Sequence, residues 1–292
     1  MNKQTKPLVS VSVVTYNHAS YIKQCLDGIL MQKTTFPFEI ILGEDDSSDG
    51  TRAICKNYAE RFPDKIRLFL RSRKDVIKIN GKPTGRFNFM ENLKACQGKY
   101  IALCEGDDYW TDPLKLQKQV DFLEGNSDFS GNFHDTLMIN ENHINSELKP
   151  WRVYDKQIFK LEDTLSITAL FHTSSFLFRR TNLIIPSWFK SVQSVDMALF
   201  TILASTGNLF RIDDVMSVYR KNATGITNNV KPIDYHNNRI KLFKHLNDFL
   251  KDRDRNRIFK IINIHEAQLK RLTKEKSLYY RLKKRLRCMF KQ

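Results

Sequence analysis

The chain has 292 residues, of which 41% are hydrophobic and 11% aromatic, so it is too apolar for a disordered protein and long enough for one large or two small domains. It has no run near the ~18 apolar residues of a membrane-spanning helix and no secretory signal at its start, so we expect it to stay in the cytoplasm. The net charge is +16, and residues 241–292 carry +12 of it, from 17 Lys or Arg against 5 Asp or Glu. The rest of the chain is therefore near neutral. A near-neutral body with a basic appendage argues against a nucleic-acid partner.

Strand and helix patterns alternate over the first hundred residues. Uncharged, largely β-branched runs of strand length recur between segments with apolar residues at helical spacing. The predicted strands cover residues 7–16, 38–42, 66–70 and 100–104, and the predicted helices cover residues 19–31, 51–62 and 87–96. Strands that alternate with helices form a parallel sheet. The predicted fold class is therefore α/β, with a doubly wound, mostly parallel sheet and helices on both faces.

Polar residues follow three of these strands. The strand ends read Thr15-Tyr16-Asn17, Glu44-Asp45-Asp46 and Glu105-Gly106-Asp107-Asp108. Such a sheet binds its ligand beyond the carboxyl ends of its strands, so we expect these acids to converge on one crevice, where they repel unless a cation or a hydrogen-bonding ligand offsets them. Carboxylate oxygens suit Mn2+ or Mg2+ shared with phosphate.

Asp107 and Asp108 are accordingly the predicted metal ligands. The alternative for this pair is a cap on the helix that follows. The glycine-rich motifs of dinucleotide sites and P-loops are absent, so neither kind of site is predicted.

Three segments together resemble the nucleotide-sugar-binding half of family 2 glycosyltransferases of the GT-A fold. They are SVVTYNHASYIKQCL, ILGEDDSSDGT and GKYIALCEGDDYWTDPLKLQKQV. The resemblance is close over residues 8–125 and looser as far as Arg220. With it we divide the chain into a donor half at residues 1–125, an acceptor-side half of the same domain at 126–230, and a tail at 231–292.

The resemblance implies a set of contacts to a nucleotide diphosphate sugar. These would come from Thr15, Tyr16, Asn17, Glu44, Asp45, Arg86, Asn88 and Asp107. Asp107 and Asp108 match the metal and ribose contacts of the family's D-x-D-D motif. Glu44 and Glu105 each stand where the family usually has Asp.

The segment SVDMALF at residues 194–200 resembles the one that carries the family's catalytic base. Asp196 is the candidate base, although Val195 replaces the usual Glu before it. The alternative reading of Asp196 is a first-turn acid that stabilises a helix N-terminus by only ~0.3–1 kcal/mol. Further on, Arg220 resembles a phosphate contact, and Asn222 stands where the family usually has His.

The tail reads as a basic amphipathic helix over residues 258–292. Its apolar side can insert into an anionic membrane surface while its Lys and Arg residues meet lipid head groups, or it can pack on the body of the protein. The first interpretation would make the protein peripheral on the inner face of the cell membrane.

The predicted function is an inverting, metal-dependent glycosyltransferase. It would move a sugar from a UDP-sugar to a hydroxyl of a growing, lipid-linked surface glycan such as a capsule or lipopolysaccharide. The alternative is a non-catalytic module that binds nucleotide sugars or carbohydrates, because the replacements at Glu44, Glu105 and Val195 are those of a lapsed enzyme.

Overall fold

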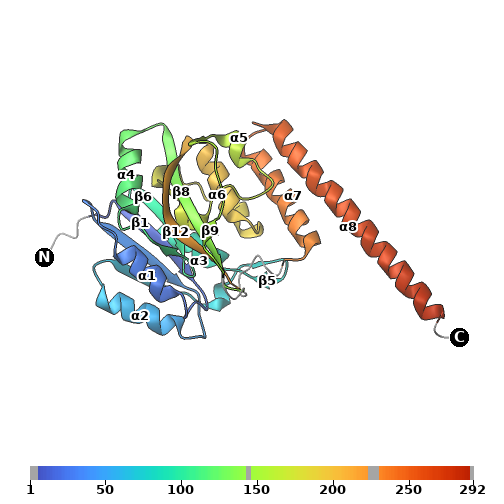
Figure 1. Ribbon diagram of the computed structural model, residues 1–292, viewed down its shortest axis with the longest axis horizontal. Coiled ribbons are helices and arrows are strands. Elements are labelled where there is room, and N and C mark those ends of the chain that lie inside the picture. The colour runs from blue at the N-terminus through green and yellow to red at the C-terminus, as the bar shows by residue number, and fades with distance from the viewer. Residues whose placement is uncertain (1–5, 143–145, 223–229, 290–292) are drawn as a thin grey trace.

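The computed structural model describes residues 6–142, 146–222 and 230–289, and the side chains of its last helix as far as Glu275. One mixed sheet forms its centre (Figure 1). The strands of this sheet are β1 (Val9–Thr15), β2 (Phe38–Glu44), β3 (Ile66–Leu70), β6 (Tyr100–Glu105), β7 (Tyr109–Trp110), β8 (Phe129–Asn140), β9 (Lys149–Pro150), β10 (Ile158–Phe159), β11 (Leu177–Arg179) and β12 (Asn208–Lys221). A separate hairpin joins β4 (Lys78–Ile79) to β5 (Lys82–Pro83).

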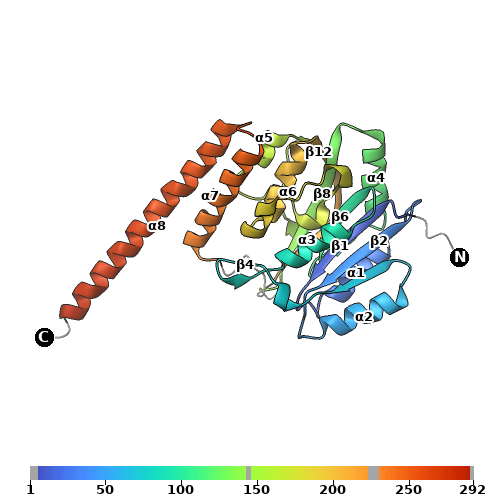
Figure 2. The same cartoon turned by 180° about the vertical axis from the view of Figure 1, so that it is seen from behind.

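The helices lie on both faces of the sheet, as predicted (Figures 1 and 2). They are α1 (Ile22–Leu30), α2 (Thr51–Arg61), α3 (Arg86–Ala95), α4 (Lys115–Gly125), α5 (Leu161–Thr164), α6 (Val195–Ala204), α7 (Pro232–Phe249) and α8 (Arg255–Met289). Apolar side chains of α1, α2 and α4 form one core. Those of α3, α5, α6, α7 and the start of α8 form the other.

The strand order is β10-β12-β8-β11-β6-β1-β2-β3. The strands β1, β2, β3 and β6 are parallel, as the alternating pattern predicted. The short strand β11 runs antiparallel between β6 and β8, so β8 and its parallel partner β12 regain the direction of β6. The carboxyl ends of β1, β2, β6, β8 and β12 therefore share one edge of the sheet.

The register of β1 with its two neighbours aligns the strand ends that carry polar residues. Thr15 lies opposite Glu44 on β2, and Val14 lies opposite Glu105 on β6. Because β1 is covered on both faces, its uncharged sequence is what such a strand requires. The predicted acids thus emerge at one level on either side of β1.

The C-terminal tail is helical, and only its first part packs on the body. Ile258, Ile261, Ile262 and His265 are buried against the rest of the protein. The 18 residues of α7 span about 27 Å, whereas the 35 residues of α8 span about 52 Å. The remainder of α8 runs past α7 and away from the body (Figure 2). Within the described residues, we find no helix that combines the length and the apolar composition required to span a bilayer.

Candidate active site

Three carboxylates gather at the end of β6. Oxygens of Glu105, Asp107 and Asp108 lie within 4.8 Å of one another. Gly106 makes this turn possible, because a Cβ there would lie 2.6 Å from Oγ1 of Thr15. The turn therefore presses against the end of β1 and holds the acids beside it.

The charges in this cluster are electrostatically unfavourable. Burial and the neighbouring charges of Asp107 and Asp196 raise the pKa of Glu105 to about 8, against an opposing effect of Arg86. Burial, and then Asp107 and Glu105, raise the pKa of Asp108 well above its usual range. Oδ1 of Asp108 accepts a hydrogen bond from the Arg220 amide at 3.0 Å, and Oδ2 is buried with no hydrogen-bond partner among the residues that the structure describes.

A divalent cation fits this arrangement. The donor set consists of oxygens, which suit Mg2+ and Mn2+. The orphaned Oδ2 of Asp108 and the mutual repulsion of the three carboxylates are both relieved by a positive charge between them. The sequence predicted Asp107 and Asp108 as ligands, and the structure adds Glu105 to the same cluster.

Residues at the end of β12 are hydrogen-bonded to the cluster. The Nη1 group of Arg220 donates to the carbonyl oxygen of Asp107 at 2.7 Å, and its Nε lies 3.2 Å from Oε1 of Glu141. The Nδ2 group of Asn222 donates to Oδ2 of Asp107 at 3.1 Å. Nε2 of His18 lies 3.8 Å from the same Asp107 oxygen. The arginine side chain is thus engaged by protein groups beside the acids.

A second niche lies at the end of β2, around Asp45. Its buried carboxylate accepts a hydrogen bond from Nη1 of Arg73 at 2.6 Å. The other oxygen, Oδ1, is buried, and no donor in the described part of the chain reaches it. Burial raises the pKa of Asp45, although Arg73 acts to lower it. The guanidinium of Arg73 also lies 4.2 Å from the ring centroid of the half-exposed Tyr16.

The acids at the two strand ends therefore form two groups rather than one. Asp45 is neutralised by Arg73, whereas Glu105, Asp107 and Asp108 share the cluster beside β6. Strands β2 and β6 flank β1 and so stand about 10 Å apart. An elongated ligand can lie across the end of β1 with one part in each group.

Two of the predicted contacts hold loops together. Glu44 is fully buried, pairs with Arg52 and accepts a hydrogen bond from the Ser47 amide at 2.6 Å. Asn17 has a positive φ of 53°, and its Oδ1 accepts from the Ser48 amide at 3.0 Å. These contacts join the loop after β1 to the loop after β2.

The two predicted contacts on α3 are bonded to backbone carbonyls. Nδ2 of Asn88 donates to the Gly43 carbonyl at 2.8 Å. Nη2 of Arg86 donates to the carbonyls of Val192 and Gln193 at 3.0 Å and 2.7 Å. Arg86 thereby reaches the segment that precedes α6.

Asp196 lies half-buried in the first turn of α6. The hydrogen bonds of Arg86 tie the segment before Asp196 to α3, and the negative charge of Asp196 acts to raise the pKa of both Glu105 and Arg86. The tertiary fold thus brings a residue from the second half of the chain to the strand ends of the first half.

The sequence missed Arg73. It placed Glu105 among the strand-end acids but not among the metal ligands, and it noted Asn222 only as a departure from the family pattern. Glu105 had a usable signal, because it opens the acidic run EGDD. Arg73 lies in a polar loop whose pattern gives no indication of its contact with Asp45. His134 and His172 are packed residues, since both are buried and hydrogen-bonded.

The family model for glycosyl transferase family 2 matches residues 10–184. The chain belongs to this family, as the sequence motifs predicted.

Relatives of known sequence agree with this assignment. An uncharacterized protein of Mycobacterium tuberculosis is 36% identical over 224 residues, which are 75% of this chain and 60% of that protein. TuaG of Bacillus subtilis, named for teichuronic acid biosynthesis, is 33% identical over 119 residues, 40% of this chain and 42% of TuaG. The chain thus spans about three fifths of the length of the mycobacterial relative.

Solved structures share the fold. TarS 1–349 of S. aureus in complex with UDP-GlcNAc has a TM-score of 0.59 at 18% identity, over 82% of this chain and 66% of that one. The mannosyltransferase PcManGT of Pyrobaculum calidifontis, in complex with GDP-Man and Mn2+, has a TM-score of 0.58 at 20% identity, over 91% and 71%. The predicted GT-A fold is confirmed.

Proposed function

We propose that this chain transfers a sugar from a nucleotide diphosphate donor, a UDP-sugar, to an acceptor hydroxyl with inversion at the anomeric carbon. One observation carries the proposal. The carboxylates of Glu105, Asp107 and the fully buried Asp108 meet at a strand end without enough positive charge, and the charge of Asp196 acts on Glu105. This arrangement suits a cation-held diphosphate on one side and a general base on the other.

The nucleoside would lie in the niche around Asp45. The ring of Tyr16 and the guanidinium of Arg73 offer flat surfaces, and Oδ1 of Asp45 offers an acceptor for an imide N–H or a ribose hydroxyl. A uracil base presents such an imide, which is why we favour a UDP-sugar. Thr15 at the end of β1 and Asp107 beside it would line the path from the base to the diphosphate.

Asp107 and Asp108, with Glu105, would hold Mn2+ or Mg2+. Such an ion neutralises the charge that develops on a departing diphosphate. Asp196 would accept the proton of the acceptor hydroxyl as that oxygen attacks the anomeric carbon. Attack from the face opposite the diphosphate inverts the anomeric configuration.

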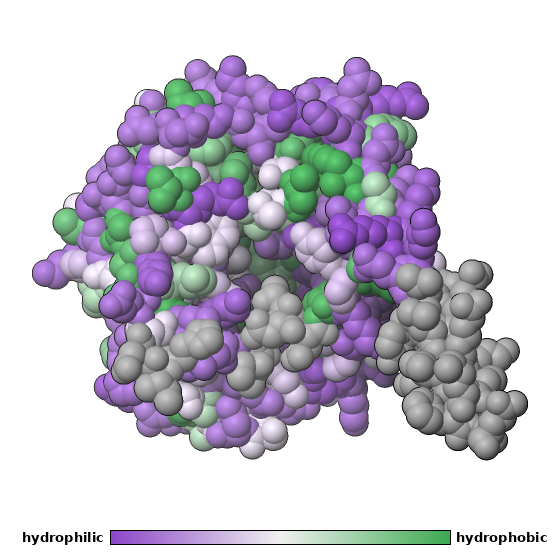
Figure 3. All heavy atoms as spheres, turned by 45° about the vertical axis from the view of Figure 1, so that its right-hand side comes forward, coloured by the Kyte–Doolittle hydropathy of each residue, from purple (hydrophilic) through white to green (hydrophobic). Residues whose placement is uncertain are grey.

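The acceptor would be a growing, lipid-linked surface glycan. The name of TuaG, which refers to teichuronic acid biosynthesis, supports a polymer of this kind. The face that Figure 3 brings forward is hollowed near its centre, which leaves room for a sugar chain. We propose that residues 1–125 bind the donor, that residues 126–230 bind the acceptor, and that residues 258–292 of the tail attach the enzyme to a membrane.

Thermal unfolding tests the donor and the cation together. With UDP and Mn2+ both present at about 100 times the dissociation constant, we expect the melting temperature to rise by roughly 5 °C, because a ligand bound only by the native state stabilises it by ~2.7 kcal/mol. UDP without Mn2+ should give a much smaller shift. UMP with Mn2+ is the control, since it lacks the second phosphate. Equal shifts with UDP in EDTA and in Mn2+ would contradict the metal-dependent site.

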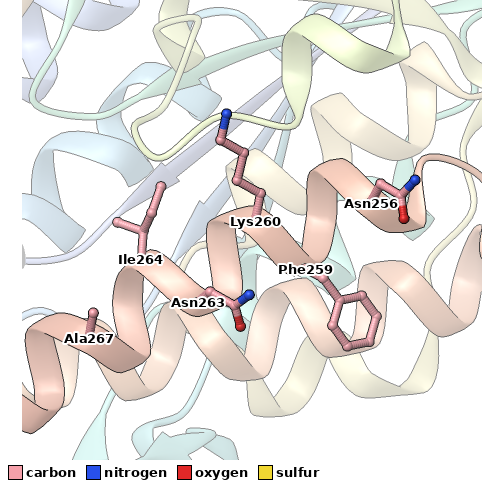
Figure 4. Close-up of a pocket in the computed structure, with 6 residues that line it drawn as sticks. All are labelled: Asn256, Phe259, Lys260, Asn263, Ile264 and Ala267. Atoms are coloured by element: carbon pink, nitrogen blue, oxygen red, sulfur yellow. The ribbon is translucent and has the colours of Figure 1, made fainter.

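Attachment to a membrane is supported by the exposed side of α8. A shallow pocket on this helix is lined by Asn256, Phe259, Lys260, Asn263, Ile264 and Ala267 (Figure 4). Phe259 is 41% and Ile264 36% exposed. The sequence beyond this pocket is strongly basic. Apolar groups beside Lys and Arg suit an anionic lipid surface, whose attraction is worth ~1 kcal/mol for each basic residue.

Neutralising the basic end of α8 should abolish this attachment. We expect a variant with five Gln substitutions to sediment at least tenfold less with phosphatidylglycerol vesicles than the unaltered chain. The substituted residues are Arg281, Lys283, Lys284, Arg285 and Arg287. A control with the same change in charge replaces Lys23, Lys33, Lys56, Lys78 and Lys94, which are exposed on the body. Equal losses in the two variants would mean that the net charge, and not α8, attracts the vesicles.

A further inference from the structure

The side chain of Arg86 is hydrogen-bonded to the segment that leads into α6. It is 7% exposed, and a single group, Nη2, donates to two consecutive carbonyls, those of Val192 and Gln193. The N-cap residue of α6 is Ser194, whose side chain makes no capping hydrogen bond within the described residues. The segment that enters α6, at Val192 and Gln193, is therefore held from outside the helix by the guanidinium.

Helix α7 braces the same segment from another direction. Nδ2 of Asn238 donates to Oε1 of Gln193, and the guanidinium of Arg239 contacts the sulfur of Met197. Both α7 residues are buried. Nδ2 of Asn80, in the turn between β4 and β5, donates to Oδ1 of Asn238 at 3.2 Å. Helices α3 and α7 thus both contact the residues around Asp196, and the turn between β4 and β5 supports α7.

The charge of Arg86 is also well placed. Burial lowers the pKa of its guanidinium to about 10, against the opposing charges of Asp196 and Glu105, so it stays protonated at neutral pH. The negative charges of Asp196 and Glu105 both favour the charged guanidinium, so Arg86 is attracted to the segment that carries Asp196.

We propose that Arg86 is a positioning residue for the Asp196 segment, and that α7 shares this role through the contact of Asn238 with Gln193. The inference rests on the proposed function of Asp196. If this inference holds, helices α7 and α8 are part of the catalytic unit. Helix α7 contacts the segment that carries the base directly, and α8 follows α7 in the chain and packs against it.

The test separates positioning from donor binding. In Arg86→Met we expect kcat for UDP release from a UDP-sugar to fall about 100-fold, with the donor KM within twofold, because a small misplacement of a reacting group has an effect of this size. Arg86→Lys should recover part of kcat. Amide hydrogen exchange of residues 192–197 should quicken in both variants, and in Asn238→Ala to a lesser degree. Lys244→Ala, at an exposed position of α7, is the control and should match the unaltered chain.

The alternative outcomes are distinct. If Arg86→Met loses the UDP–Mn2+ thermal shift while exchange at residues 192–197 is unchanged, Arg86 is a nucleotide contact and the inference is wrong. If the unaltered chain turns over no UDP-sugar, the proposed donor is wrong, and the exchange data still decide whether Arg86 and Asn238 hold the segment. Should Arg86→Met not fold, Arg86→Lys and Asn238→Ala decide the same question.

Discussion

Replacing Asp196 with Asn is expected to lower kcat for sugar transfer about 1,000-fold while the donor affinity stays within twofold. The amide keeps the size of the side chain and cannot accept the proton of an acceptor hydroxyl. The charge of Asp196 acts on Glu105 in the acid cluster, and its segment is held by Arg86 and Asn238, so the loss should appear in the chemical step. Transfer rates with the UDP-sugar and UDP affinities by titration calorimetry measure the two quantities.

Asp234→Asn is the matched control. Asp234 is an acid in the first turn of α7, as Asp196 is in the first turn of α6, and both are half-buried. A helix N-terminus gains only ~0.3–1 kcal/mol from such an acid, so the control should lose a little stability and no activity. If Asp196→Asn behaves like the control, Asp196 is a helix-stabilising acid and the non-catalytic binding module becomes the better interpretation.

Replacing Asp108 with Asn should weaken Mn2+-dependent UDP binding by more than ~100-fold and, at the same time, stabilise the ion-free protein. The carboxylate is fully buried, one of its oxygens is orphaned, and its two neighbours carry the same charge. Titration calorimetry with Mn2+ and UDP measures the first effect. Urea unfolding in EDTA measures the second as a higher free energy of unfolding.

The stability difference should depend on pH in a defined direction. Because the folded-state pKa of Asp108 is raised, the protonated carboxyl is favoured by folding, and the unaltered chain loses stability as pH rises from the ordinary Asp range of ~3.9 toward the folded-state value. Asp108→Asn lacks this loss, so its advantage in EDTA should grow from pH 4 upward. A constant or shrinking advantage would contradict the electrostatic account.

Asp112→Asn is the contrasting control. Asp112 lies four residues further along, and although burial acts to raise its pKa, the ion pair with Lys118 and a hydrogen bond from the Leu114 amide lower it. Its ionised form is thus favoured by folding, and its replacement should destabilise the protein at neutral pH without altering Mn2+ binding. Changes of opposite sign in the free energy of unfolding at Asp108 and Asp112 would distinguish the repulsion within the acid cluster from a general effect of removing a charge.

The sequence by itself determined the donor half of the fold. Buried parallel strands need uncharged β-branched residues, and the helices between them need an apolar stripe, so both leave periodic patterns that are readable one segment at a time. It also marked Asp45, Asp107 and Asp108 as strand-end acids. Since parallel strands end at one edge, their grouping near β1 followed from local patterns alone.

Only the tertiary structure decided which oxygen of each acid is satisfied and by what. Arg73 neutralises Asp45 from 28 residues away, Arg86 reaches Gln193 across 107 residues, and Arg220 and Asn222 close on Asp107 across more than 110. Glu44, an acid like its neighbours, forms an ion pair with Arg52, whereas Oδ2 of Asp108 has no hydrogen-bond partner in the described chain and lies 3.9 Å from Nε2 of His172. Such contacts depend on side-chain direction at the strand ends and on the packing of α3, α6 and α7, and neither has a period in sequence from which it could be inferred.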